Sequence, residues 1–430
     1  ATGDERRAVE EALARGGGKA GLGALLAGLG AAAVEEARAA TLAARQRIKD
    51  ADARERRGYA AEVKHFLGLA KTKASPAATV AGLRLLGFLE DEAAVPLLLE
   101  HATGAKRPAE VREEALIALR FLGRDKKAPA TGKLAASAAT KLAGVAETAA
   151  LPTARAALFT LACLPLPGAL APRLAKLATH PEAERALLAA ECVARMPSPD
   201  AGRALGQLLL TTRERAVAEA AATALAARAD AGAVLARALL ETKDPDRVAL
   251  LAKLLRPHGR ALDAKIVRPL REAAVARLGA GDAAPTWEPL LQAAREADAP
   301  AAAEALRAAG AKLRKTKPER ALAALRLLGR AADATPEDGY AWATLELAAG
   351  RRDEALTIFG QLAERGFDLA DALRRDRALD AETRYQIGFH FAERRHPVGE
   401  EILAAVAQAA GRTKVGQMAR AKLRSSGYAD

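Results

Sequence analysis

Histidine and cysteine are the side chains that most often bind metal ions or act as nucleophiles, and this chain holds six histidines and two cysteines. Helical zinc sites favour histidine pairs one turn apart or cysteine pairs two residues apart. The closest histidines, His390 and His396, are six residues apart, and Cys163 lies far along the chain from Cys192. No Gly-x-Ser-x-Gly motif occurs, and neither cysteine has a histidine at a motif-like distance. The sequence therefore predicts no metal, no cofactor and no enzyme activity.

One glycine run, Gly16-Gly17-Gly18-Lys19, contains residue types that a phosphate-binding loop uses. In such a loop, backbone N–H groups and a lysine hold the phosphates. The motif also needs a glycine where this chain has Leu13 and a serine or threonine where it has Ala20. Because both positions differ, we assign the run no phosphate chemistry.

Arginines and aromatic residues remain as candidate partner-binding residues. Five arginines recur beside an apolar ladder and form either a basic stripe for an acidic peptide or phosphate backbone, or a solvated face: Arg112, Arg120, Arg155, Arg173 and Arg185. Exposed aromatic residues are common anchors in binding grooves. Tyr340 and Trp342 therefore either anchor a peptide or fill the core of a repeat.

The net charge of +13 is concentrated in one part of the chain. Residues 101–176 carry 12 lysines and arginines and 5 aspartates and glutamates, a net charge of +7. A strongly basic face is typical of nucleic-acid binding. Nucleic-acid binding through a basic face at 101–176 is therefore one possible function.

The elements that must position these residues are indicated by leucines at helical spacing. The ladder has four copies: Leu83-Leu86-Leu89, Leu116-Leu119-Leu122, Leu158-Leu161-Leu164 and Leu187-Ala190-Val193. A hairpin of two short helices cannot bury its apolar face alone, so such hairpins stack on their neighbours. No sustained alternation of apolar and polar residues indicates strands. The sequence predicts an all-α protein, an α-solenoid of stacked helical hairpins.

A second signal marks the other helix of each hairpin. An aspartate precedes it as a predicted N-cap, at Asp91, Asp200, Asp230 and Asp263. The best single copy of this pattern is Asp-x-x-Ala-Val-Pro-x-Leu at 91–98. On the basis of this pattern, residues 59–311 resemble HEAT repeats of the short bacterial kind, also called bilin-lyase-type repeats. We expect residues 1–58 to form an N-terminal helical cap, and a longer loop near 126–129. The resemblance implies protein binding, and it leaves a bilin-lyase-like chromophore-attachment subunit as an alternative.

Residues 312–430 have a separate repeat. Arg320-Ala321-Leu322 aligns with Glu354-Ala355-Leu356 at an offset of 34 residues, which is the period of tetratricopeptide repeats. Residues 342–362 resemble that family locally, although Phe367 stands where the family has proline. An insertion at 368–380 displaces the next helix. The predicted architecture is thus a HEAT-like array followed by tetratricopeptide-like repeats.

These observations favour a non-enzymatic scaffold that binds a protein or peptide, with an acidic segment as the preferred partner, along concave repeat surfaces. The longest run without a charged residue, Ala20 to Val34, has fifteen residues, fewer than the roughly 20 that a membrane helix needs. We expect a soluble protein, cytoplasmic or exported after removal of a signal peptide. The sequence decides neither the compartment nor the oligomeric state.

Overall fold

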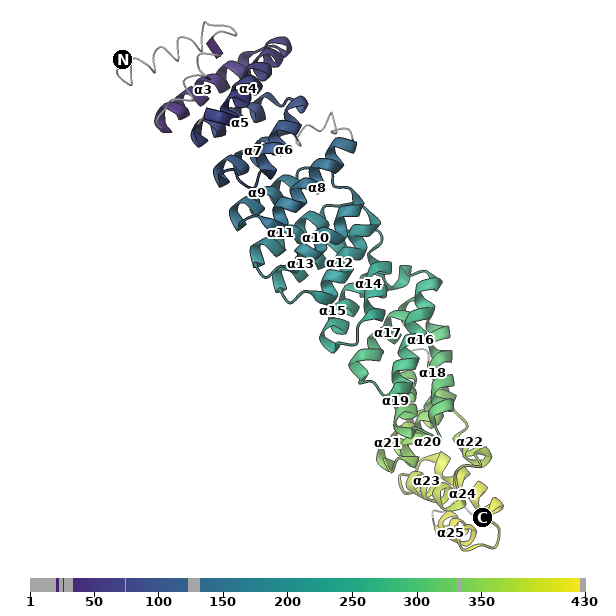
Figure 1. Cartoon of the computed structure of the whole chain (residues 1–430). Coiled ribbons are helices and arrows are strands. Elements are labelled where there is room, and N and C mark those ends of the chain that lie inside the picture. Colours follow the sequence, from purple (N-terminus) through teal and green to yellow (C-terminus); the bar gives the residue numbers. More distant parts are fainter. Residues whose placement is uncertain are drawn as a thin grey trace. The chain divides into compact units, whose positions relative to one another are not determined.

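The computed structural model describes residues 21–22, 26, 34–73, 75–122, 132–331 and 334–425. In this part of the chain there are 23 α-helices and no strands, and neighbouring helices pack in series (Figure 1). The predicted all-α solenoid is confirmed. The glycine run at 16–19 and the predicted loop at 126–129 lie outside the described residues.

The chain divides into two compact units, Ala1–Ala238 and Leu239–Asp430. Helix α14 (Ala231–Glu241) runs through this boundary. The boundaries predicted at 58/59 and 311/312 mark expected changes in the kind of repeat, which the division into compact units does not test, so they stay predictions.

The first unit has two layers of helices. One layer packs in the order α3, α5, α7, α9, α11, α13, the other in the order α6, α8, α10, α12, and each helix of the second layer also packs against the next helix of the first (Figure 1). The helices are α3 (Val34–Asp50), α4 (Ala53–Lys73), α5 (Pro76–Leu89), η1 (Glu92–Ala94), α6 (Val95–Thr103), α7 (Ala109–Leu122), α8 (Gly132–Thr148), α9 (Leu151–Leu161), η2 (Gly168–Leu170), α10 (Ala171–Leu177), α11 (Ala183–Ala194), α12 (Pro199–Thr211) and α13 (Arg215–Ala226).

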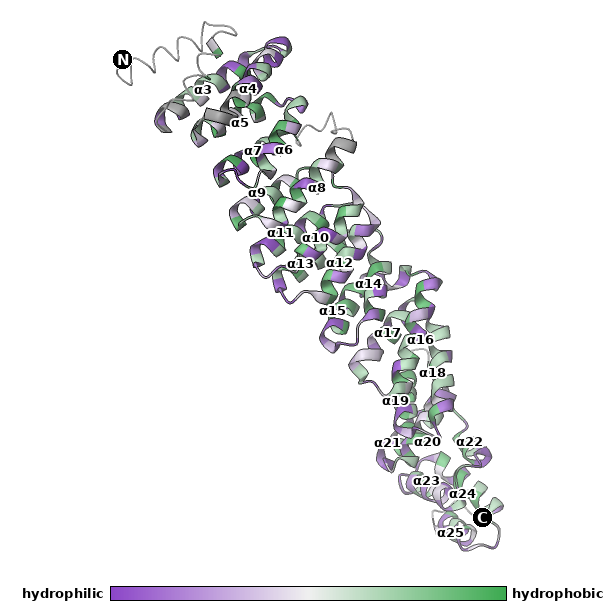
Figure 2. Ribbon diagram, viewed as in Figure 1, coloured by the Kyte–Doolittle hydropathy of each residue, from purple (hydrophilic) through white to green (hydrophobic). Residues whose placement is uncertain are grey.

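The leucine ladder supplies much of the core of this unit. Leu83, Leu86 and Leu89 are buried on α5, and the second copy falls on α7. Leu158 and Leu161 of the third copy are buried on α9, whereas Leu164 lies beyond the end of that helix. The weaker fourth copy falls on α11, where Leu187 is half-buried. Fully buried alanines between the leucines, such as Ala154, let neighbouring helices approach closely. Figure 2 shows that most helices carry both hydrophobic and hydrophilic stretches, as helices with one buried face should.

Helix starts combine a capping side chain with a proline in the first turn, where the missing N–H costs nothing. This pairing begins six of the described helices: Ser75-Pro76, Ser198-Pro199, Asp244-Pro245, Thr335-Pro336, His396-Pro397, and Asp298 with Pro300. The predicted N-cap Asp263 is confirmed on α16, whereas Asp91 caps the short helix η1 that leads directly into α6. The prediction for Asp200 is wrong, because Ser198 caps that helix and Asp200 lies in its first turn.

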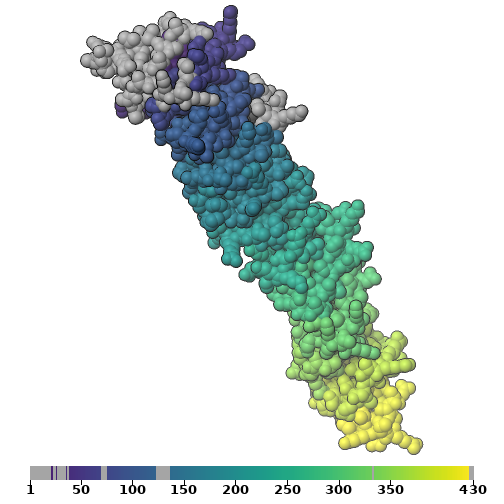
Figure 3. All heavy atoms as spheres, in the orientation of Figure 1, coloured from purple at the N-terminus to yellow at the C-terminus, as the bar shows by residue number. Residues whose placement is uncertain are grey.

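The second unit continues with helix pairs and short connecting helices. They are α15 (Pro245–Leu255), η3 (Arg256–Ala261), α16 (Ala264–Ala280), α17 (Ala284–Ala297), α18 (Ala299–Leu313), α19 (Pro318–Gly329), α20 (Pro336–Ala348), α21 (Arg352–Glu364), α22 (Leu369–Arg375), α23 (Ala381–Glu393), α24 (Pro397–Ala409) and α25 (Lys414–Ser425). The predicted insertion at 368–380 contains α22, which packs against α24. Figure 3 shows all heavy atoms of the described residues as spheres, closely packed along each unit.

No helix in the described residues is long and apolar enough to cross a membrane.

Candidate interaction surfaces

The five candidate arginines do not all lie in one layer of the first unit. Arg112 and Arg120 are on α7, Arg155 is on α9 and Arg185 is on α11, which pack side by side in one layer. Arg173 is on α10, in the other layer. The structure thus brings four of the five onto neighbouring helices.

Two of these arginines donate hydrogen bonds to main-chain carbonyls where second-layer helices end. Arg112 Nε lies 3.2 Å from the oxygen of Ala102 in the last turn of α6. Arg185, only 5% exposed, donates to the oxygens of Glu147 (3.1 Å) and Ala149 (2.8 Å) at the end of α8. Carbonyls in the last turn of a helix lack intrahelical partners and carry partial negative charge. Both side chains therefore join the two layers.

Two further arginines pair with carboxylates. Arg173 makes a two-pronged contact with Glu147, at 2.6 and 2.7 Å, and this hydrogen bonding holds the pKa of Glu147 below its usual value. Arg155 Nη1 lies 3.3 Å from Glu184, with both side chains about half exposed. Within the predicted basic face at 101–176, Arg112, Arg155 and Arg173 therefore each have an acceptor inside the unit.

The fifth arginine, Arg120, lies over the ring of Phe159, with its guanidinium carbon 5.6 Å from the ring centre. Phe159 belongs to a set on three helices that pack in series in the first layer, and we call this set the phenylalanine row: Phe88 on α5, Phe121 on α7 and Phe159 on α9. Phe88 and Phe121 meet edge to face at 5.7 Å. Arg45 lies 4.6 Å from the ring centre of Phe88.

The outer member of the phenylalanine row is exposed. The side chain of Phe159 is 42% exposed to solvent. Among the described residues, only two other large hydrophobic side chains, Leu42 and Phe389, are exposed. Sequence reasoning missed this set. The available signal was the position of Phe88 and Phe121, each one residue before the end of its leucine ladder at Leu89 and Leu122.

In the second unit, Tyr340 is held by its hydroxyl and its ring. The hydroxyl lies 3.3 Å from the oxygen of Ala372 and 3.1 Å from Asp376 Oδ2. The ring centre lies 5.8 Å from that of Phe359 and 6.0 Å from that of Phe367. Burial, together with the nearby charge of Asp376, raises the pKa of Tyr340. Tyr340 thus fixes α22 against α20.

Trp342 belongs to a polar network centred on Glu346, which is fully buried. Trp342 Nε1 donates to Glu346 at 2.7 Å. Arg326 donates twice, at 2.5 and 3.1 Å, and Arg351 donates at 2.6 Å. Burial favours a raised pKa for Glu346, but the hydrogen bonds from Arg326, Arg351 and Trp342 outweigh it and lower the pKa. Arg330 lies 5.6 Å from the centre of the indole.

Comparison with known proteins adds only coarse information about this arrangement. No protein-family model matches the chain, and no curated protein matches it. Among solved structures, an engineered protein is 18% identical, with 94% of this chain and 98% of that chain covered and a TM-score of 0.32. Human deoxyhypusine hydroxylase in complex with glycerol is 15% identical, with 72% and 96% covered and a TM-score of 0.26.

The histidine and cysteine side chains are candidate metal ligands or nucleophiles because of their residue types. Among the described residues, no three histidine, cysteine, aspartate or glutamate side chains are grouped so that they could hold a metal ion. Cys192 is buried and donates to the oxygen of Leu158 at 3.4 Å, and burial raises the pKa of its thiol to about 12. The thiol is therefore protonated at neutral pH and is a poor nucleophile.

Proposed function

We propose that this protein is a non-enzymatic α-solenoid scaffold that binds another protein through the phenylalanine row. The observation that carries the proposal is the exposure of Phe159 at 42%, beside Arg120. Aromatic residues and arginine are enriched in the centres of protein interfaces, where a few of them supply most of the binding energy. Helical repeats supply the rigid, extended surface that such recognition uses.

The composition of this surface indicates its partner. Phe159 offers an apolar ring, and Arg45 and Arg120 add positive charge beside the phenylalanine row. A partner segment with apolar side chains next to acidic ones complements both features. A nucleic-acid partner gains less support, because Arg112, Arg173 and Arg185 are committed to carbonyls and carboxylates within the unit.

Site-specific photo-crosslinking in the native host tests this proposal. A benzophenone side chain at position 159 should give a reproducible crosslinked protein product. The same probe at Arg215, which is exposed on α13, is the matched control and should not give that product. Phe159→Ala should weaken binding of the purified partner by roughly tenfold to a hundredfold. Identical products at both positions, or none at position 159, would contradict the proposal.

A further inference from the structure

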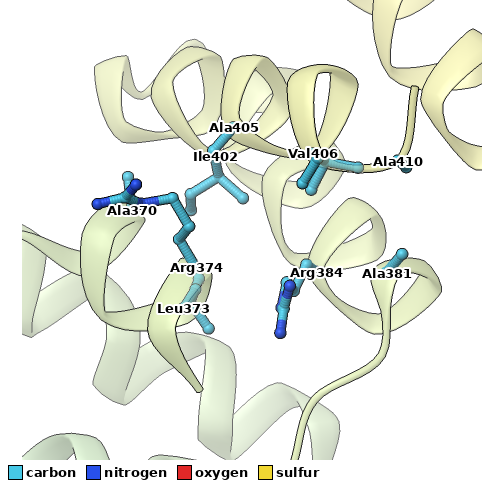
Figure 4. Close-up of a pocket in the computed structure, with 10 residues that line it drawn as sticks. Ala370, Leu373, Arg374, Ala381, Arg384, Ile402, Ala405, Val406 and Ala410 are labelled. Atoms are coloured by element: carbon cyan, nitrogen blue, oxygen red, sulfur yellow. The ribbon is translucent and has the colours of Figure 1, made fainter. Parts of the chain in front are cut away.

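The second unit contains a small apolar cavity between α22, α23 and α24 (Figure 4). Its volume is about 130 Å³. The apolar lining consists of three larger aliphatic side chains and five alanines: Leu373, Ile402, Val406, Ala370, Ala381, Ala405, Ala409 and Ala410. In Figure 4, Leu373 and Ile402 point into the open space between the helices. The cavity can therefore accept a hydrocarbon group.

One guanidinium group faces this apolar lining from α23. Arg384 also lines the cavity. Its Nη2 donates to the main-chain oxygen of Asp376 at 2.6 Å, which fixes the side chain. Its Nε is buried and has no hydrogen-bond partner within the part of the chain that the structure describes. A buried donor without an acceptor is costly, so the site favours an added acceptor.

The second arginine at the cavity does not compete for the same ligand group. Arg374 forms an ion pair with Asp371 within its own helix. Figure 4 shows the Arg374 guanidinium beside Ala370, turned away from Arg384. The cavity thus has one principal positive group, which matches a single negative charge rather than a phosphate or a polyanion.

We propose that this cavity binds a free short-chain aliphatic carboxylate. The hydrocarbon chain packs against Leu373, Ile402 and Val406, and the carboxylate accepts hydrogen bonds from the donors of Arg384 that Asp376 does not use. A cavity of comparable size, about 150 Å³, accommodates benzene in an engineered protein. The ligand therefore has about six carbons.

Tight binding at this site should require both a negative charge and a six-carbon chain. Titration calorimetry on the full chain measures the affinities of three probes that differ in charge but share that chain length. Sodium hexanoate should bind at least about tenfold more tightly than hexan-1-ol, because a charge-assisted hydrogen bond is added. Hexylammonium has the same chain with the opposite charge and should bind more weakly than either. Equal binding of hexanoate and hexylammonium, or no saturable binding of hexanoate, would overturn the proposal.

Three variants locate the site. Ala405→Leu fills the cavity and should abolish binding of hexanoate and hexan-1-ol. Ala404→Leu adds the same volume at the neighbouring exposed position of α24 and should leave binding unchanged. Arg384→Gln should reduce hexanoate binding to the level of hexan-1-ol, and retained hexan-1-ol binding shows that this variant is folded. Unchanged hexanoate binding in Ala405→Leu or Arg384→Gln places the ligand elsewhere and refutes the assignment.

Discussion

At the scale of single residues, the buried Glu346 determines what Trp342 does in the structure. A buried carboxylate is tolerated only when its charge is paired and its oxygens accept hydrogen bonds. Glu346 meets this condition through Arg326, Arg351 and the Trp342 indole. Trp342 therefore has a structural role, because its indole N–H donates a hydrogen bond to the buried Glu346. Its predicted role as an anchor for a binding partner stays a prediction.

Glu346→Gln should lower the free energy of unfolding by about 3 kcal/mol at pH 7, because two guanidinium groups lose their shared charged acceptor. The folded-state pKa of Glu346 lies below its ordinary value of 4.5. Its contribution is therefore complete above pH 4.5 and is lost as the pH falls through the folded-state pKa. Urea denaturation followed by tryptophan fluorescence should show the difference between wild type and variant at pH 7 and 5, and a smaller one at pH 3.

The matched control is Glu364→Gln, at an exposed position of α21, which should cause no measurable change. A difference for Glu346→Gln that stays constant down to pH 3 would show that the carboxylate charge does not matter.

At the scale of helices, arginine side chains connect successive hairpins through the carbonyls of helix ends. Besides Arg112 and Arg185, Arg228 donates to the oxygens of Met196 and Ser198, both at 2.8 Å, after the end of α11. Arg277 donates to the oxygen of Leu240 in the last turn of α14, at 2.9 Å. The carbonyl of Leu240 lies in a last turn, where the helix itself leaves it open, whereas the carbonyl of Ser198 also accepts the first backbone hydrogen bonds of α12. Basic residues outnumber acidic ones in this chain, which gives the net charge of +13. Some of the arginines in this excess donate to main-chain carbonyls and so do not need acidic side chains as partners.

Arg185→Met should lower the free energy of unfolding by about 3 kcal/mol, because it keeps the apolar stem and leaves two carbonyls at the end of α8 without their charged donor. Arg185→Lys should recover only part of this loss, since one ammonium cannot reproduce the planar fork. Thermal or urea denaturation followed by circular dichroism measures both. Arg215→Met, which removes only an exposed pair with Glu219, should have no measurable effect. Full recovery by lysine would contradict the two-carbonyl explanation.

The sequence predicts the helices better than the contacts between them. Leu83, Leu86 and Leu89 indicate a helix because their spacing is local. The bonds of Arg185 join it to residues more than 30 positions away, and no local pattern specifies which carbonyl an arginine reaches. The error at Asp200 has a different cause, because a local signal was available: Ser198 and Pro199 form a better helix start two residues earlier. The cavity beside Arg384 depends on α22, within a segment that sequence analysis treated only as an insertion.

At the scale of the whole molecule, stability in stacked repeats comes from contacts between neighbours, so damage stays local. The chain offers a direct test because both tryptophans, Trp287 and Trp342, lie in the second compact unit. Tryptophan fluorescence therefore reports on that unit, whereas circular dichroism reports on both. Arg185→Met in the first unit should produce an earlier transition by circular dichroism and leave the fluorescence midpoint unchanged. Glu346→Gln should shift the fluorescence midpoint. If Arg185→Met moves both midpoints equally, the chain unfolds as one cooperative body and the two units are not independent.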